Sequence, residues 1–555
     1  MKDNVKKIVA MLLCIAMIAA VAACTPATPA APAAAEPAAE APAAAAEPAA
    51  EEPAAEAEPV KIVVSVQATT GAEEGWKAVA DAYTTMHPNV EVVIDLKPVD
   101  GYAEWIQTVF TTEGTEVDIA NVNLAGAVKS GKTINYLEYL YNDSPYSDGT
   151  WADQFNTEAQ VRDIARDEMD SLSLESVQVL WFYNADIFDE VGVQPPTTWA
   201  EFVAVCEKLE AAGYQPISIA GDYNSFWSGA MGWLAQIYAD QTTRSLINTY
   251  RAQEGDYCFD PDVDGVWAYD ANDPYNDDSY KVNQNTVRMF KAIKDGTYTA
   301  DTEGMRTVWN SFAEIFPKYA GGDNFFGTSD AVPMFYQGKA AIMVDGGWRL
   351  INFKNDMAKL VSGEEIKSGD VAIEGVQQFR LGTFNMPSME GAGIEAKART
   401  IEVPTGFLGC IKKDKAHDDA VMDLLMYFSS AEGQGKFLAA GLEVGYVPNG
   451  PSLVYGVELP TDIAESFANL SFIGNCQKGY GQKLARGMSG SAGDIDASYR
   501  AFYDYSYNFL TGKIGIEDWI AAHQKNILTY LPEAMSTSGV SDADLENPQN
   551  APVGQ

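Results

Sequence analysis

The 555-residue sequence is poor in the residues that carry metal and redox chemistry. It contains three histidines, and its six cysteines include no C-x-x-C pair. Zinc and redox centres need several such side chains at short spacing. The sequence also lacks a G-x-S-x-G turn, a Walker phosphate loop and an H-E-x-x-H helix. We therefore expect a protein that is not an enzyme and that requires no cofactor.

Basic residues are also scarce. The chain has 37 Lys and Arg against 78 Asp and Glu, a formal net charge of −41. Such a surface repels nucleic acid and anionic lipid headgroups. No long apolar run follows the first 24 residues, so no transmembrane helix is expected in the rest of the chain. These absences exclude nucleic-acid binding and leave the N-terminus as the place for a membrane attachment.

The N-terminus has the pattern of a bacterial secretion signal. Lysines at positions 2, 6 and 7 precede an apolar run from Ile8 to Ala23 that is too short to cross a bilayer comfortably. The sequence Val-Ala-Ala-Cys at 21–24 resembles a lipobox, in which the cysteine is acylated. We expect a signal peptide at 1–23 and a lipid on Cys24 that holds the protein on the extracellular face of the cell membrane. An ordinary signal peptide, in which Cys24 has no role, is the alternative.

Residues 24–59 consist almost entirely of Ala, Pro and Glu. The segment has no aromatic residue to bury, its prolines favour extended backbone and its glutamates repel one another. We predict a disordered stalk.

The chain beyond residue 60 is too long for one hydrophobic core, so at least two lobes are expected. A β-branched run at 61–66 is followed by helical periodicity from Trp76 to Met86, a strand at 90–96, a helix at 102–110 and a strand at 117–122. This alternation predicts a doubly wound parallel sheet that binds ligand beyond the carboxyl ends of its strands, at loops 67–74 and 121–126.

The same alternation resumes near residue 177. A strand is expected at 177–183, and Thr198 with Glu201 forms a capping-box pattern before an amphipathic helix that contains Cys206. Another strand is expected at 217–219. The helical position of Cys206 favours a buried small apolar residue over a disulfide, and no bridge is predicted.

Four segments in this order carry a resemblance to a known family: 179–188 (VLWFYNADIF), 192–202 (GVQPPTTWAEF), 335–348 (FYQGKAAIMVDGGW) and 416–437 with Ala-Glu-Gly at 431–433. Together they resemble the family 1 extracellular solute-binding proteins of ABC importers, the maltose-binding-protein-like group. The resemblance implies a periplasmic-binding-protein-like fold, in which two α/β lobes joined by a multi-segment hinge close on a sugar or oligosaccharide. It also implies delivery to the transmembrane permease subunits of an importer. We expect a monomer.

The expected boundaries follow from this resemblance. Lobe 1 comprises 60–175 with 402–450, lobe 2 comprises 176–401 with 451–535, and 536–555 is a disordered tail. The hinge crossings are expected near 174–182, 400–409 and 446–459.

An acidic insertion at 248–285 departs from the family pattern. Within it Asp260, Asp262 and Asp264 precede a glycine, which is the D-x-D-x-D-G opening of an EF-hand-like calcium loop. The glutamate expected at the twelfth position of the loop is Ala271. Calcium binding and a merely solvated acidic turn both remain open.

Sugar receptors need aromatic platforms and planar polar groups. Three aromatic residues lie beside glycine or at the start of a helix rather than on a helical stripe: Trp227, Trp348 and Phe407. Five polar residues occupy loops that the resemblance places towards the other lobe: Glu73, Asn123, Asp222, Asp345 and Arg349. An oligopeptide receptor and a secreted glycan-active enzyme are the alternatives to a sugar receptor.

Overall fold

The computed structural model describes residues 59–162, 167–227, 229–278, 281–468, 470–471, 473–477, 484–488 and 495–553. The predicted signal peptide, Cys24 and all but the last residue of the predicted stalk lie outside the described residues. Within the described ranges, no helix combines the length and the apolar character that crossing a bilayer requires.

The first sheet is built from short β-branched runs. Its order is β11-β3-β1-β2, in which β1 is parallel to β2 and β3, and β11 is antiparallel to β3. The strands are β1 (Val60–Ser65), β2 (Val90–Ile94), β3 (Ile119–Asn121) and β11 (Leu408–Cys410). The predicted alternation of parallel strands and helices is therefore confirmed, with one late antiparallel strand added at the edge.

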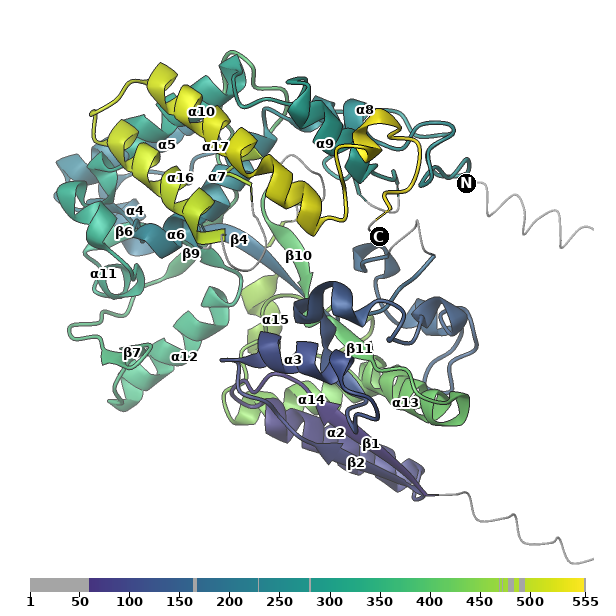
Figure 1. Ribbon diagram of the computed structural model, residues 1–555. Coiled ribbons are helices and arrows are strands. Elements are labelled where there is room, and N and C mark those ends of the chain that lie inside the picture. The colour runs from purple at the N-terminus through teal and green to yellow at the C-terminus, as the bar shows by residue number, and fades with distance from the viewer. Residues whose placement is uncertain are drawn as a thin grey trace, which may run out of the picture. The chain divides into compact units, whose positions relative to one another are not determined.

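Four main helices pack with this sheet: α2 (Ala72–Met86), α3 (Tyr102–Thr111), α13 (Lys415–Phe428) and α14 (Ala431–Glu443). The apolar stripe of α2 is buried, and Trp76 on it stacks on Phe428 with ring centroids 4.0 Å apart. Segments more than 300 residues apart in sequence thus share one hydrophobic core. Figure 1 shows α2 and α14 beside β1 and β2. We call this assembly the first-sheet region.

The second sheet has the order β10-β4-β6-β5, with β9 also paired to β4. Its strands are β4 (Glu175–Asn184), β5 (Gln215–Ser218), β6 (Ala340–Gly346), β9 (Leu381–Phe384) and β10 (Glu402–Thr405). Only β5 and β6 are parallel, because β4 runs antiparallel to β6, β9 and β10. The second sheet is therefore mixed rather than wholly parallel.

The second sheet and its helices form the second-sheet region, which has a separate core. These helices are α4 (Ala185–Val191), α5 (Trp199–Ala211), α6 (Tyr223–Trp227), α7 (Ala230–Asp240), α10 (Glu303–Ile315), α11 (Val332–Tyr336), α12 (Arg349–Ser362), α15 (Thr461–Phe467), α16 (Ile495–Leu510) and α17 (Ile516–Thr537). A small hairpin, β7 (Lys367–Ser368) and β8 (Val371–Ala372), follows α12. Helix α5 begins at the predicted capping box of Thr198 and Glu201, and the buried Cys206 lies in the core.

The acidic insertion packs with α8 (Ile247–Tyr250), α9 (Thr286–Lys294) and the C-terminal segment around a third apolar cluster. In that cluster Val540 and Leu545 are buried, and the carbonyl of Gln549 accepts a 2.8 Å hydrogen bond from the Tyr257 backbone N–H. Residues 540–553 therefore differ from the disordered tail that was predicted. The physical reason is that these two apolar side chains complete a core that the insertion alone leaves open.

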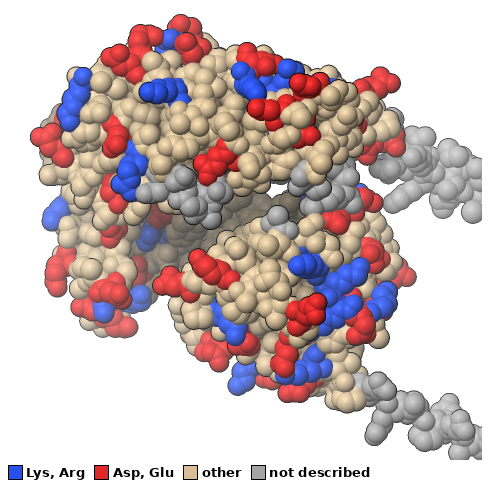
Figure 2. All heavy atoms as spheres, in the orientation of Figure 1, with Lys and Arg blue, Asp and Glu red and all other residues tan. Residues whose placement is uncertain are grey.

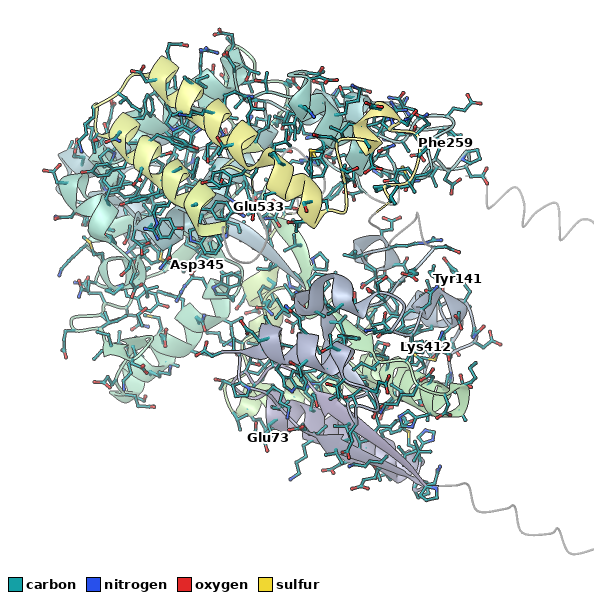
Figure 3. All side chains as sticks on the ribbon, viewed as in Figure 1. Glu73, Tyr141, Phe259, Asp345, Lys412 and Glu533 are labelled. Atoms are coloured by element: carbon teal, nitrogen blue, oxygen red, sulfur yellow. The ribbon has the colours of Figure 1, made fainter. Side chains whose placement is uncertain are left out.

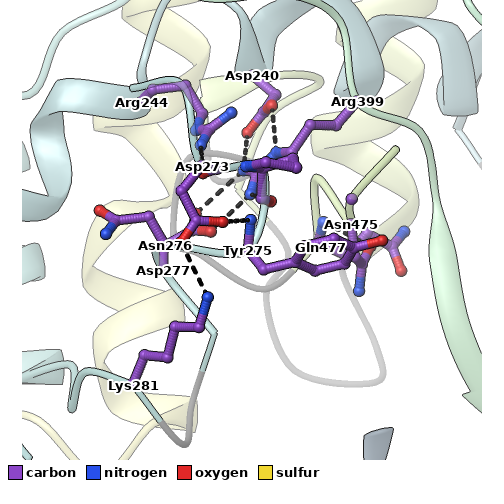
Figure 4. A network of polar contacts seen from close by, with 12 residues as sticks. Asp240, Arg244, Asp273, Tyr275, Asn276, Asp277, Lys281, Arg399, Asn475 and Gln477 are labelled. Carbon is purple, nitrogen blue, oxygen red and sulfur yellow. Dashed lines mark hydrogen bonds and ion pairs between the residues drawn. The ribbon is translucent and has the colours of Figure 1, made fainter. Parts of the chain in front are cut away.

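A buried arginine ties the insertion to the second sheet (Figure 4). Arg399, 1% exposed, lies between Asp240 of α7 and Asp277 of the insertion. Its Nε is 2.9 Å from Asp240 Oδ2, and its Nη2 is 3.0 Å from Asp277 Oδ2. The insertion is thus fixed to the chain just before β10.

Three segments run side by side where the two regions join. Glu175 at the start of β4 pairs with Thr405 at the end of β10 and forms a bridge with Ser452. Leu172, just before β4, forms a bridge with Leu408 of β11. Glu175, Thr405 and Ser452 fall within the segments 174–182, 400–409 and 446–459, whose role as hinge crossings stays a prediction. Strand β10, assigned by sequence to lobe 1, pairs within the second sheet. Figure 1 shows β4 and β10 reaching the first-sheet region, and Figure 2 shows the surface hollowed between the parts that carry α16 and α3.

Candidate functional site

A cavity of about 360 Å³ lies at the carboxyl ends of β1 and β3. Parallel strands end together at one edge of a sheet, so the residues that follow them gather there. The lining comes from both of these strand ends, from α2, α13 and α14, from the crossing segments and from the chain after α14. We call this space the strand-end cavity.

One side of the strand-end cavity is held by Asn121, the last residue of β3. Its Oδ1 accepts a 2.8 Å hydrogen bond from the backbone N–H of Gln67, and its Nδ2 donates a 2.6 Å bond to the carbonyl of Gly406. The hydroxyl of Tyr102 donates to the carbonyl of Ser65 and accepts from the Asn121 N–H. These bonds fix the end of β1, the end of β3 and the loop between β10 and β11 relative to one another.

A carboxylate stands on the opposite side. Glu175 accepts hydrogen bonds from the Tyr446 hydroxyl at 2.8 Å, the Asn449 backbone N–H at 3.2 Å and the Asn449 side-chain amide at 3.0 Å. Burial raises the pKa of Glu175 above its usual value, and these three hydrogen bonds oppose the rise. The first and third crossing segments are therefore joined through one carboxyl group.

A left-handed glycine lets the ring of Tyr446 reach this position. Gly71, with φ +75°, precedes α2, and a Cβ placed on it would lie 2.8 Å from the Cβ of Tyr446 and 2.6 Å from the Gly441 carbonyl oxygen. Any larger residue would push α14 and Tyr446 away from α2. The N-terminus of α2 thus packs directly against the cavity wall.

The paired strands β4 and β10 separate the strand-end cavity from a second cavity of about 340 Å³. Successive side chains of a strand point to opposite faces. The pair Glu175 and Thr405 lines the strand-end cavity, whereas the next pair, Ser176 and Pro404, lines the second one. A movement of this ribbon would therefore alter both cavities.

Trp348 lies beside the strand-end cavity, at the turn between β6 and α12. Its ring covers Gly346, where an added Cβ would lie 2.3 Å from the ring. The next residue, Gly347, donates a 2.8 Å hydrogen bond to the carbonyl of Gln178 in β4, and a Cβ on it would lie 3.1 Å from the carbonyl oxygen of Asn449. Asn449 lines the cavity, so the Gly-Gly turn sets Trp348 next to its wall.

Two aromatic pairs adjoin each other on α6 and α7. Trp348 meets Trp233 edge to face, with ring centroids 6.3 Å apart, and Trp227 stacks on Tyr499 of α16 at 5.1 Å and 11°. Gly232, next to Trp233, packs against the backbone of Trp227. The predicted residues Trp227 and Trp348 thus belong to one group of four aromatic rings, which we call the aromatic group.

The predicted polar residues of the second-sheet region are engaged within the protein. Asp345 and Arg349 pair with each other at 2.8 Å, and Arg349 also reaches the Tyr336 hydroxyl at 3.3 Å. Asp222 accepts hydrogen bonds from the backbone N–H and hydroxyl of Ser225 at the start of α6. Asp222 therefore caps α6, and the Asp345–Arg349 pair stabilises the turn that carries Trp348.

The remaining predicted residues do not line the strand-end cavity. Glu73 is exposed in the first turn of α2 and Asn123 is exposed in the 3-10 segment Val122–Lys129. Figure 3 labels Glu73 on the first-sheet region and Asp345 on the second. Phe407, with φ +46°, lies in the β10–β11 loop, where its carbonyl accepts from the Val122 N–H.

Sequence reasoning missed most of the cavity wall. It identified both strand-end loops but selected Glu73 and Asn123 where Gln67 and Asn121 face the cavity. Trp76 was interpreted as core, and it both packs in the core and lines the cavity. The available signal was the position of Asn121 and Gln67 directly at the strand ends. No local pattern indicated Glu175, Tyr446 or Asn449.

Two aspartates of the candidate calcium loop, Asp260 and Asp264, serve as internal acceptors. Asp264, 3% exposed, accepts from the Asn283 backbone N–H at 2.7 Å, the Asn283 amide at 2.8 Å and the Asp260 N–H at 2.8 Å. Asp260 accepts from the Asp262 N–H. In the part of the chain that the structure describes, no three His, Cys, Asp or Glu side chains form a group suited to a metal ion. These aspartates therefore hold the shape of the insertion through hydrogen bonds.

Comparison with known proteins adds a family and a set of folds. The family profile described as "Bacterial extracellular solute-binding protein" matches residues 68–435. A search of curated protein sequences finds no match. Among solved structures, apo RafE from Streptococcus pneumoniae is 15% identical, with 86% of this chain and 98% of that chain covered and a TM-score of 0.54.

Two further solved structures are similar to this chain at 15% identity. The cyclic α-maltosyl-1,6-maltose binding protein from Arthrobacter globiformis has a TM-score of 0.52 over 85% of this chain and 99% of its own. A family 1 extracellular solute-binding protein from Bifidobacterium longum subsp. infantis has a TM-score of 0.51 over 85% and 100%. At this identity the likeness shows the fold, which agrees with the two α/β sheets described above.

Proposed function

Because the chain belongs to the family of bacterial extracellular solute-binding proteins, we propose that it is the substrate-binding lipoprotein of an ABC importer and that its ligand is a sugar or oligosaccharide. The observation that carries this proposal is the aromatic group together with the strand-end cavity, whose lining residue Asn449 lies against the turn that carries Trp348. Flat aromatic rings bind the apolar faces of sugar rings, while amide and carboxylate groups nearby bind the hydroxyls. Trp348, Trp227, Gln67 and Asn449 supply both kinds of group.

The proposed mechanism is closure of the first-sheet and second-sheet regions on the ligand. The crossing segments bend while each region keeps its own core. Glu175 is well placed to couple them, because it is bonded to Tyr446 and Asn449 and its neighbour Gln178 contacts the turn that carries Trp348. A transmembrane permease then recognises the closed form and receives the sugar.

The lipid anchor on Cys24 and the stalk at 24–59 complete this proposal. A flexible tether keeps the receptor at high effective concentration near a permease and still lets it rotate. Mass spectrometry of the membrane-extracted protein tests the anchor: the mature chain should begin at an acylated Cys24. A chain that is secreted without lipid would contradict it.

The proposed ligand class is tested by titration calorimetry and thermal shift with oligosaccharides and, in parallel, with oligopeptides. We expect only oligosaccharides to raise the unfolding temperature, because a ligand that binds the native state stabilises it by mass action. Chromatography of the recovered sugar should show no cleavage. Stabilisation by peptides alone supports an oligopeptide receptor, and cleavage of the sugar supports a glycan-active enzyme.

Small-angle scattering tests closure. Saturating ligand should reduce the radius of gyration of the folded part, and an unchanged radius with bound ligand would contradict the closure mechanism.

A further inference from the structure

Arg486 lies beside the aromatic group and is half-buried. Its guanidinium carbon is 5.7 Å from the ring centre of Tyr499, on which Trp227 also stacks. Its Nη1 is 3.0 Å from the position that a Cβ on Gly232 would take. The cation is therefore held between α7 and α16, next to the rings that we propose bind sugar.

The charge of Arg486 is met by a neutral group. With its amide oxygen turned towards the arginine, Gln236 accepts at 3.1 Å from Nε, 3.1 Å from Nη1 and 2.8 Å from Nη2. No carboxylate among the described residues forms an ion pair with it. Burial lowers the pKa of Arg486, and the nearby Tyr499 opposes this effect.

Three other shielded arginines of this protein are neutralised by acidic side chains. The pairs are Arg399 with Asp240 and Asp277, Arg349 with Asp345, and Arg288 with Asp256. A shielded charge without a counterion costs free energy unless a partner arrives. Arg486 differs from these three because no carboxylate among the described residues pairs with it. It differs from the buried Arg244, which donates to the carbonyl of Asp273, because it lies beside the aromatic group.

A second donor lies close by. The indole Nε1 of Trp227 is buried and has no hydrogen-bond acceptor in the described part of the chain. Trp227 and Arg486 both contact the ring of Tyr499. The indole N–H of Trp227 and the guanidinium of Arg486 can only donate hydrogen bonds, and both residues contact the Tyr499 ring. Both donors are suited to an acceptor that carries negative charge.

We propose that the ligand is an acidic oligosaccharide, with a uronic-acid carboxylate that pairs with Arg486. This inference rests on the proposed sugar-binding function and narrows its ligand class. The planar guanidinium matches a carboxylate with two parallel hydrogen bonds, while the aromatic rings bind the face of the same sugar unit. A neutral sugar would leave the cation without a counterion inside the closed site.

The test compares matched pairs of ligands on the unmodified protein by titration calorimetry. The probes are trigalacturonic acid with its methyl ester, and xylotetraose with and without a 4-O-methylglucuronic acid branch. We expect the acidic member of at least one pair to bind about tenfold or more tightly than its neutral partner, the size of a charge-assisted hydrogen bond. Equal affinity within every pair, or binding of neutral members alone, overturns the inference and leaves the sugar-binding function standing. Failure of every sugar, together with binding of peptides, overturns both.

Variants locate the effect. Arg486→Gln should remove the preference for the acid over its neutral partner, and Arg486→Lys should retain part of the preference. Arg380→Gln, which removes the same charge from an exposed position paired with Asp186 and Asp189, should change neither affinity. A folded Arg486→Gln protein that still prefers the acid overturns the inference. If that variant does not fold, the acid and ester pair on the unmodified protein decides the question.

Discussion

Glu175 accepts a 2.8 Å hydrogen bond from the hydroxyl of Tyr446, although the two residues are 271 positions apart. The bond joins the first residue of β4 to the segment that follows α14, at the place where the two regions of the protein meet. Glu175 also receives both hydrogen bonds that Asn449 donates. A single carboxyl group therefore connects the crossing segments, the strand-end cavity and the neighbourhood of Trp348.

The pH dependence of stability should report on this carboxyl group. Burial raises the pKa of Glu175 in the native state, so the native protein holds this proton more tightly than the unfolded chain does. The resulting stabilisation is present below the usual glutamate pKa and is lost as the pH rises through the raised pKa. We expect the unfolding free energy of wild type relative to Glu175→Gln to fall as the pH rises from 4 to 8. Urea unfolding of both proteins measures this difference.

The isosteric glutamine serves as the control for shape. Its amide adds a donor where the Asn449 side chain also donates. This lowers the unfolding free energy of the variant by an amount that does not vary with pH. Parallel stability profiles for the two proteins would show that the Glu175 pKa is not raised.

Trp348 should contribute to ligand affinity more than to folding. Trp348→Ala removes a partly exposed ring that meets the edge of Trp233 and covers Gly346. We expect sugar affinity to fall by about fivefold or more, since a stacking ring is worth at least about 1 kcal/mol when burial is included. The matched control is Trp105→Ala on α3, a partly exposed tryptophan that contacts Tyr102. Calorimetry on both variants should show a loss for Trp348 alone, and equal losses would contradict this role.

The sequence predicted the elements of the site better than its side chains. Strand and helix periods are local, so the two predicted loops do lie at strand ends, while their role in ligand binding stays a prediction. Which loop residue faces inward depends on tertiary contacts. Asn121 ends a strand and points to the cavity, whereas Asn123 lies two residues on, in a 3-10 segment, and is exposed.

Contacts of long sequence separation were beyond prediction for a different reason. Glu175 faces the strand-end cavity only because residues near 446–449 return to it, and no periodicity encodes such a meeting. The same holds for Val540 and Leu545, whose partners in the cluster come from α17 and from the insertion. Whether an isolated apolar residue is buried depends on residues that are distant in the sequence.

His523 should make the protein sensitive to mild acid. It is fully buried, its Nδ1 lies 2.7 Å from the Tyr505 hydroxyl and its Nε2 lies 2.6 Å from the carbonyl of Leu484. Burial lowers its pKa to about 4. Between pH 6.5 and 4, His523 is therefore protonated in the unfolded chain and neutral in the native protein. Stability from this group is therefore complete above pH 6.5 and falls by about 3 kcal/mol towards pH 4. His523→Gln should lose that component, as measured by chemical unfolding across this range.

An equal loss of stability in wild type and His523→Gln would show that groups other than His523 cause the acid sensitivity. If wild type and His523→Gln lose equal stability between pH 6.5 and 4, the buried imidazole already carries its proton in the native state. A constant offset between the two curves reports only the changed hydrogen bonds to Tyr505 and Leu484.

Arg399 should be indispensable to folding. Its guanidinium neutralises Asp240 and Asp277, both of which are almost fully buried. Arg399→Met keeps the length of the side chain but leaves two shielded carboxylates with no counterion, which should lower the unfolding free energy by about 3–5 kcal/mol. The exposed Arg380→Met, which also faces two aspartates, should cost far less because solvent screens those pairs.

The cause of the loss can be separated from loss of packing. In the triple variant Arg399→Met, Asp240→Asn and Asp277→Asn, none of the three substituted side chains carries a charge. Most of the stability should therefore return if uncompensated carboxylates are responsible. Recovery would show that the insertion can be held to the second sheet without the Arg399 ion pairs, by contacts such as the bond between the Tyr275 hydroxyl and Glu402 of β10. If the triple variant is as unstable as Arg399→Met, the guanidinium acts instead through its shape and its bond to the Pro274 carbonyl. The position of the acidic insertion beside β10 then depends on the Arg399 side chain itself.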